Sequence, residues 1–223
     1  MNLSHSYPSP AKAWWAMVVL FLAYTLSFID RTILALLVEP LRRDLGLSDT
    51  EISLLHGLAF AIFYSTMGVP IAVLSDKRSR RLIIGVGVFF WSLMTVLCGV
   101  ATSFWKLFAA RLGVGVGEAT LGPATYSLVA DLFPEHLRGK AMGFFATGIH
   151  VGAGLALIVG GAIVGMAAGV GEIETAVGTF RSWQLVFFIV GAPGLIIALL
   201  CATMIEPKRI IVAKTVETAT SEL

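Results

Sequence analysis

Six long apolar segments, separated by short polar ones, run along almost the whole chain. They cover residues 14–38, 52–74, 82–101, 104–133, 141–168 and 183–205. Each reaches the ~20 residues that a helix needs to cross a hydrocarbon core of ~30 Å. The pattern therefore predicts an all-α membrane protein with six transmembrane helices.

Composition supports the same class of protein. Of the 223 residues, 57% are hydrophobic and 13% are charged, whereas a soluble domain carries about 25% charged residues. The mean hydropathy is +0.87. The two cysteines, Cys98 and Cys201, both fall inside apolar segments, where a thiol packs as a small apolar group, so no disulfide framework is expected.

The distribution of Lys and Arg predicts the orientation. With a cytoplasmic N-terminus, ten of the 16 basic residues lie in inner segments and four in outer ones, as the positive-inside rule favours. We therefore expect a cytoplasmic N-terminus at 1–13, a six-helix bundle at 14–205 and a cytoplasmic tail at 206–223. The expected location is the plasma (inner) membrane, with multiple passes.

Two ionisable residues, Arg111 and Glu118, stand seven positions apart inside the fourth segment. Seven residues make almost two turns, so both side chains leave one face of a helix, a face that Gly115, Gly122 and Thr125 continue. Charges in a membrane normally face a protein interior or a water-filled cavity. This face is expected to line a polar path through the bilayer.

Asp30, in the first segment, lies about 12 Å from the outer end of its helix, and Arg111 lies about 10 Å from the outer end of its own. Asp30 and Arg111 can therefore form an ion pair. The negative charge of Glu118, near the bilayer centre, would then be less fully balanced by a positive one. Burial disfavours the charged form of a carboxyl group, so Glu118 suits a proton carrier. The alternative is that these charges only hold helices together through a satisfied network.

The six segments form two groups of three, one to three and four to six. In each group the first segment carries the buried charges. This suits a three-plus-three inverted repeat in which the paired first helices line the pathway. Coincidence among six segments is the alternative.

The loop after the second segment is rich in basic residues. It holds Asp76, Lys77, Arg78, Arg80 and Arg81. In the simpler interpretation, these basic residues only fix the loop on the cytoplasmic side of the membrane. More specifically, an acid here can cap a helix N-terminus and the arginines can bind helix C-termini or acids. Such contacts would act as a latch that holds one conformation and breaks in another.

Other polar positions are candidates for a solute cavity. Tyr24, Ser27 and Arg31 share one side of the first helix, and Thr125 lies on the face of Glu118. His150, in the fifth segment, either lines the cavity or hydrogen-bonds to a neighbour.

Two of these motifs resemble those of the major facilitator superfamily. Residues 76–81 (DKRSRR) are similar to its cytoplasmic loop motif, and residues 111–119 (RLGVGVGEA) to its fourth-helix motif. Within the superfamily the chain resembles the spinster-like transporters, through residues 28–31 (FIDR), 45–49 (LGLSD), 57–60 (GLAF), 123–126 (PATY), 130–134 (ADLFP) and 191–194 (GAPG).

The resemblance implies the N-terminal six-helix bundle of the major facilitator fold. It also implies secondary transport, often proton-linked, of a lipid-like or other amphipathic solute by alternating access. The buried acid of the family's first helix corresponds to Asp30, and the charges of its fourth helix to Arg111 and Glu118.

The chain departs from the family pattern in two ways. Ala72 and Ser79 stand where the superfamily usually has glycine. The chain also matches one half of a twelve-helix architecture in which the solute binds between halves. The expected partner is a second six-helix half, which is a missing C-terminal part, a separate chain or a second copy; we favour the first.

Other classes of protein are less well supported. An intramembrane serine protease is not favoured, because no Gly-x-Ser-x-Gly-like nucleophile elbow accompanies Ser127 and His150. A water channel would carry Asn-Pro-Ala signatures, and none occurs. A metal site is unsupported because the four histidines lack metal-ligand spacing. We expect no enzyme, cofactor, metal or nucleic-acid partner; the remaining alternative is a non-transporting structural or regulatory membrane subunit.

Overall fold

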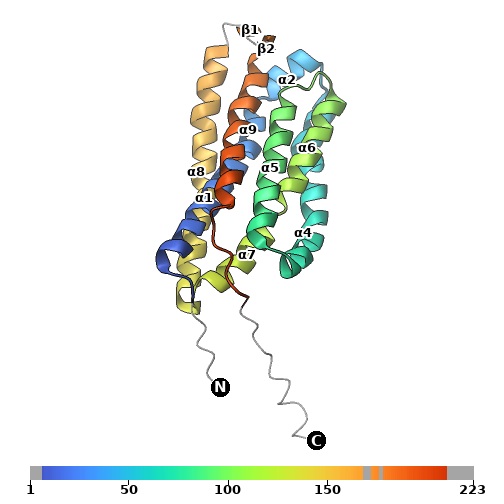
Figure 1. Cartoon of the computed structure of the whole chain (residues 1–223). Coiled ribbons are helices and arrows are strands. Elements are labelled where there is room, and N and C mark those ends of the chain that lie inside the picture. Colours follow the sequence, from blue (N-terminus) through green and yellow to red (C-terminus); the bar gives the residue numbers. More distant parts are fainter. Residues whose placement is uncertain (1–6, 168–171, 176–177, 210–223) are drawn as a thin grey trace, which may run out of the picture.

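Long helices run back and forth along one axis, so the molecule is an elongated bundle (Figure 1). The computed structural model describes residues 7–167, 172–175 and 178–209. The helices are α1 (Pro10–Leu36), α2 (Val38–Leu45), α3 (Asp49–Ser53), the π-helical turn η1 (Leu54–Leu58), α4 (Ala59–Lys77), α5 (Arg80–Cys98), α6 (Phe104–Glu118), α7 (Leu121–Leu132), α8 (Glu135–Ala167) and α9 (Ser182–Cys201). Two strands, β1 (Glu172–Thr175) and β2 (Gly178–Arg181), pair antiparallel.

Five helical stretches of the described residues are long and apolar enough to cross a membrane. They are Pro10–Leu36, Asp49–Lys77, Arg80–Cys98, Glu135–Ala162 and Ser182–Cys201. The sixth crossing is made by α6 and α7 together. The all-α, six-helix architecture predicted from the apolar segments is confirmed.

The predicted fourth helix, 104–133, is wrong as one continuous element. It divides into α6 and α7, with a turn at Ala119 and Thr120. Pro123 favours a break here, because it has no N–H to donate to the carbonyl of Ala119 and its ring clashes with that carbonyl in a regular helix. Glu118 therefore ends α6 within the bundle. The face expected to continue from Glu118 to Thr125 belongs to two helices.

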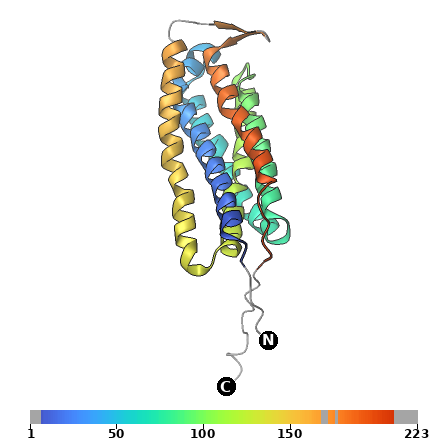
Figure 2. The ribbon, with the colours of Figure 1, turned by 60° about the vertical axis from the view of Figure 1, so that its left-hand side comes forward.

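Helix pairs α1–α8 and α5–α9 make the most extensive contacts in the bundle, and the two pairs lie beside each other in both views (Figure 2). Small residues allow the close approach. A Cβ placed on Gly152 of α8 would lie 2.8 Å from Cβ of Phe28 on α1, and one on Gly194 of α9 would collide with Ser92 of α5. Without a hydrophobic driving force between helices in lipid, such tight packing supplies much of their association.

The connection between the first two crossings follows local capping rules. Helix α2 is capped by Gly46, whose φ of 65° is left-handed and favours glycine. Ser48 then opens α3 with a capping box, in which its hydroxyl and the Glu51 carboxylate each bind the other residue's backbone N–H.

The described ends of the chain meet at the opposite end of the bundle from the β-hairpin (Figure 1). The indole Nε1 of Trp15 in α1 donates to the hydroxyl of Thr203, just after α9, over 2.8 Å. An even number of crossings brings both ends to one side of a membrane. The domain boundaries at 13/14 and 205/206 stay predictions.

Candidate functional site

A buried ion pair joins α1 to α6. Nη1 of Arg111 lies 2.7 Å from Oδ1 of Asp30, and both side chains are 2% exposed. The hydroxyl of Thr95, on α5, donates to the other carboxylate oxygen of Asp30. The pairing expected from equal depth is therefore present. Through the Asp30 carboxylate, α1 is linked to both α5 and α6.

A second ion pair lies beside the first, and it corrects one expectation. Oε2 of Glu118 accepts hydrogen bonds from Nε of Arg31 and from Oγ of Ser27, each over 2.7 Å, and Nη2 of Arg31 lies 2.6 Å away. Glu118 is therefore not less compensated than Asp30. Arg31 and Ser27 are four residues apart on α1 and so share the face that meets Glu118.

Arg31 also lies against aromatic rings. Its guanidinium carbon is 5.0, 4.4 and 4.9 Å from the ring centroids of Phe28, Phe60 and Tyr64, within the range of cation–π attraction. The Arg31 side chain is 26% exposed, whereas that of Glu118 is fully buried. Arg31 therefore joins the buried carboxylate to a more open, aromatic-lined region.

Two polar atoms of this cluster have no hydrogen-bond partner among the described residues. They are Oε1 of Glu118 and Nε of Arg111, both buried. An unpartnered buried polar atom is costly, and such atoms are uncommon in native structures. Oε1 of Glu118 is thus the carboxylate oxygen that can take a proton without losing an existing hydrogen bond.

The other predicted cavity residues are less closely engaged. Tyr24 stacks on Phe145 with centroids 4.2 Å apart, and Thr125 is buried with its hydroxyl unpartnered among the described residues. His150 is exposed on α8. The structure thus brings together Ser27, Asp30, Arg31, Arg111 and Glu118, but it does not link Thr125 or His150 to them.

The basic loop between α4 and α5 forms a second polar cluster. Arg80 is only 1% exposed. It pairs with Asp131 of α7, donates from Nε to Oε1 of Glu206 over 2.8 Å, and donates from Nη2 to the carbonyl of Pro207 over 3.0 Å. This one guanidinium therefore connects the loop, α7 and the segment after α9.

Arg81 binds the C-terminal end of α9. Its Nη1 donates to the carbonyl oxygen of Ala202, the residue that caps α9, over 3.3 Å, and to that of Met204 in the turn that follows, over 3.0 Å. The contacts expected of the loop arginines, to acids and to a helix C-terminus, are thus both present. In the described part of the chain, the exposed side chains of Asp76, Lys77 and Arg78 form no hydrogen bond or ion pair.

Glu206 is a member of this cluster that sequence reasoning missed. Besides Arg80, it accepts from the Ser79 hydroxyl over 2.8 Å and from the backbone N–H of Arg81 over 2.9 Å. Partial burial opposes its ionisation, but these hydrogen bonds outweigh burial and hold the pKa of Glu206 below its ordinary value. The available signal was an acid directly after the last apolar segment, on the side where the arginines gather.

Within the described residues, no three His, Cys, Asp or Glu side chains are grouped so that they could hold a metal ion. The buried charges of the bundle are instead matched by one another. The chemistry that this arrangement offers is proton uptake and ion-pair exchange.

Comparisons with known proteins point to one family. The family model of the Major Facilitator Superfamily matches residues 20–222. The chain is 31% identical to an MFS-type efflux pump of Mycolicibacterium smegmatis over 85% of its own length and 41% of the relative's. It is 30% identical to a probable L-galactonate transporter of Escherichia coli K12, over 82% of this chain and 37% of the relative.

A solved structure shows the same fold. It is a bacterial homolog of the human lysosomal transporter spinster, in an inward-facing and occupied conformation, with a TM-score of 0.83 and 37% identity. The match covers 91% of this chain and 46% of that one, so the chain spans less than half the length of these relatives. The resemblance read from the sequence motifs is confirmed: the chain belongs to the Major Facilitator Superfamily and is similar to its spinster members.

Proposed function

We propose that this chain is the N-terminal half of a proton-coupled secondary transporter that moves a small amphipathic or lipid-like solute by alternating access. The observation that carries the proposal is the contact of Arg31 with Glu118, next to the Asp30–Arg111 pair. In this contact a proton and the partly exposed Arg31 cation compete for the same carboxylate, that of Glu118.

The first step of the proposed mechanism is protonation of Glu118. A proton on Oε1, the unpartnered oxygen, would neutralise the carboxylate that now holds Arg31. Removing one partner of a buried ion pair leaves the other charge uncompensated. Arg31 would then turn toward a new anion, while the Asp30–Arg111 pair keeps α1 and α6 together.

The second step is solute binding. Arg31 offers a planar set of donors that suits carboxylates and phosphates, and Phe60 and Tyr64 offer apolar faces around it. This combination favours a solute with an anionic head and an apolar body. The probable L-galactonate transporter among the relatives is consistent with an anionic head.

Alternating access requires a second half. The proposed partner is a further six-helix unit packed against this one in the plasma membrane, with both described ends on the cytoplasmic side. The Arg80–Asp131–Glu206 cluster would hold the loop rigid, so that Asp76 and Arg78, which are exposed here, act as the latch against the second half. Substituting Asp76 should shift the conformational balance without loss of solute binding.

The test is transport by the native protein that contains this chain, reconstituted into vesicles with an imposed pH gradient. A fluorescent lysophosphatidylglycerol serves as the anionic amphipathic probe. Glu118→Gln should abolish proton-driven flux while exchange without a gradient persists. Glu51→Gln, at the exposed capping box, is the matched control and should keep wild-type coupling.

Unchanged proton-driven flux in Glu118→Gln would contradict the coupling role. Failure of the wild-type protein to move either this probe or L-galactonate, in an otherwise active preparation, would contradict the proposed class of solute.

A further inference from the structure

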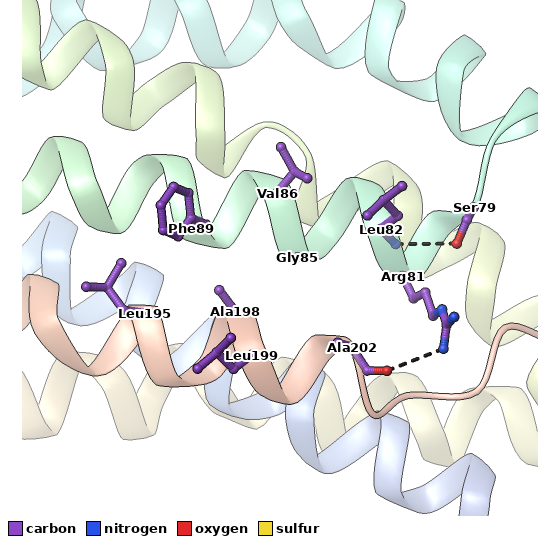
Figure 3. A pocket seen from close by; sticks show the side chains of 10 residues that line it. All are labelled: Ser79, Arg81, Leu82, Gly85, Val86, Phe89, Leu195, Ala198, Leu199 and Ala202. Atoms are coloured by element: carbon purple, nitrogen blue, oxygen red, sulfur yellow. Dashed lines mark hydrogen bonds between the residues drawn. The ribbon is translucent and has the colours of Figure 1, made fainter.

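An apolar groove lies between α5 and α9 (Figure 3), and its lining includes none of Asp30, Arg111 and Glu118. It encloses about 580 Å³. Its lining residues are Ser79, Arg81, Leu82, Gly85, Val86, Phe89, Leu195, Ala198, Leu199 and Ala202. The proposed transport mechanism uses none of the apolar members of this set.

Small residues hollow the groove and large ones form its rims. Gly85 and Ala198 face each other at its floor, where a Cβ on Gly85 would lie 3.6 Å from the carbonyl oxygen of Ala198. Leu82 and Leu199 stand on the two sides and are 63% and 73% exposed. On the outer surface of transmembrane helices, such apolar walls meet acyl chains rather than water.

The length of the groove matches one leaflet. From Ser79 to Phe89 the helix rises about 15 Å, which is half of a hydrocarbon core of ~30 Å. A chain lying along α5 would therefore extend from the interface to about the bilayer centre, as one lipid tail does.

The end of the groove nearest the interface is cationic. Arg81 lies there, and its Nη1 is held by the carbonyls of Ala202 and Met204. Because a guanidinium has five donors, the remaining ones can face an anion without release of these contacts. The neighbouring carboxylate, Glu206, is bound by Arg80 and Ser79.

We propose that this groove is a binding site for an anionic phospholipid of the leaflet that faces both described ends of the chain. Its phosphate binds Arg81 and one acyl chain lies between α5 and α9. The lipid is a bound component of the protein, distinct from the transported solute. By joining the loop arginine to the end of α9, it would strengthen the same face that the Arg80 cluster holds.

The test uses the native protein, stripped of lipid in detergent and offered equal amounts of phosphatidylglycerol and phosphatidylcholine with identical chains. Native mass spectrometry counts each bound lipid. Wild type should retain phosphatidylglycerol about fivefold more than phosphatidylcholine, the preference expected for one interfacial arginine. Arg81→Gln should lose this preference, and Ala202→Phe, which fills the groove, should reduce binding of both lipids.

Two controls match these variants. Arg78→Gln removes an equal charge from the same loop, and Ile196→Phe enlarges an exposed residue of α9 outside the groove; both should bind lipid as wild type does. Equal retention of the two lipids by wild type, or unchanged binding by Ala202→Phe, would overturn the proposal. If Arg81→Gln fails to give a monodisperse protein, Ala202→Phe decides, because it fills the groove and leaves the positive charge in place.

Discussion

At the scale of single residues, the molecule places two acids and two arginines in adjacent pairs between α1 and α6. Asp30 and Arg31 are consecutive, so their side chains leave α1 about 100° apart, and each meets a different partner on α6. Neutralising one pair therefore leaves the other intact. This separation lets one pair respond to protons while the other holds the helices.

The dependence of Glu118 on Arg31 can be tested by a double-mutant cycle. Arg31→Gln leaves a buried carboxylate without its cation, and such single losses cost about 3–5 kcal/mol. The double variant Arg31→Gln/Glu118→Gln should recover much of this loss, because no uncompensated charge remains. Thermal unfolding of the four proteins in detergent measures both effects.

Additive destabilisation in that cycle would mean that the two side chains do not interact. Arg43→Gln is the control for the removal of a positive charge. Its side chain is 72% exposed, so this substitution should change stability little.

The Thr95 hydroxyl allows a milder test of the other pair. Thr95→Val keeps the shape of the side chain but removes its hydrogen bond to Asp30, so we expect a loss of about 1–3 kcal/mol. Thr66→Val, in which the lost hydroxyl bonds only to its own helix and is exposed, is the control. Equal stability of Thr95→Val and wild type would show that this contact contributes nothing.

At the scale of elements, the break between α6 and α7 is the clearest departure from a simple six-helix pattern. The apolar character of 104–133 is continuous, so hydropathy alone merges the two helices. Pro123 was the sequence signal for a break in this helix. Proline also occurs within membrane helices without ending them, however, as Pro70 does within α4 and Pro193 within α9. Only the packing around Ala119 and Thr120 decides between a kink and a break.

Part of the candidate site could likewise be predicted from the sequence. The spacing of Arg111 and Glu118 and the depth of Asp30 were sufficient to place three charges on facing helices. The partner of Glu118 was not predictable from depth, because Arg31 reaches along its helix by a long flexible side chain. Glu206 was missed because it follows the last apolar segment and reads as part of a polar tail.

Pro123 gives a prediction at this scale. Pro123→Ala restores an N–H that can donate to the carbonyl of Ala119, so α6 and α7 should join more regularly. Amide hydrogen exchange between residues 119 and 124 should slow markedly. Pro70→Ala, in α4, should leave exchange in this segment unchanged; exchange at the wild-type rate in Pro123→Ala would assign the break to tertiary packing alone.

The cluster around Glu206 predicts a pH dependence of stability. Because the pKa of Glu206 is lowered in the folded protein, its contribution is present above the ordinary glutamate value of about 4.3. It is lost as the pH falls through the folded-state pKa. Glu206→Gln should therefore unfold at a lower temperature than wild type at pH 7, and the two proteins should converge in acid.

Thermal unfolding between pH 7 and about pH 3 checks this expectation. Glu39→Gln, at an exposed acid of α2, should follow the wild-type curve. A constant difference between wild type and Glu206→Gln across this range would contradict the role of ionisation.

At the scale of the whole molecule, the bundle matches less than half of its relatives. A solute site between two halves is complete only when both are present. We therefore expect the native polypeptide to be about twice the 23.8 kDa of this chain. Blotting of source membranes with an antibody against the N-terminal segment measures this; a band at 23.8 kDa would instead require a separate second half or self-association.

The hydrogen bond between Trp15 and Thr203 has a practical consequence for spectroscopy of the moving protein. It holds the beginning of α1 and the end of α9 beside each other within one rigid bundle. A pair of spin labels near these positions should report one short, narrow distance in every conformation. That pair would serve as an internal ruler, against which the changing distances to labels on the second half can be calibrated.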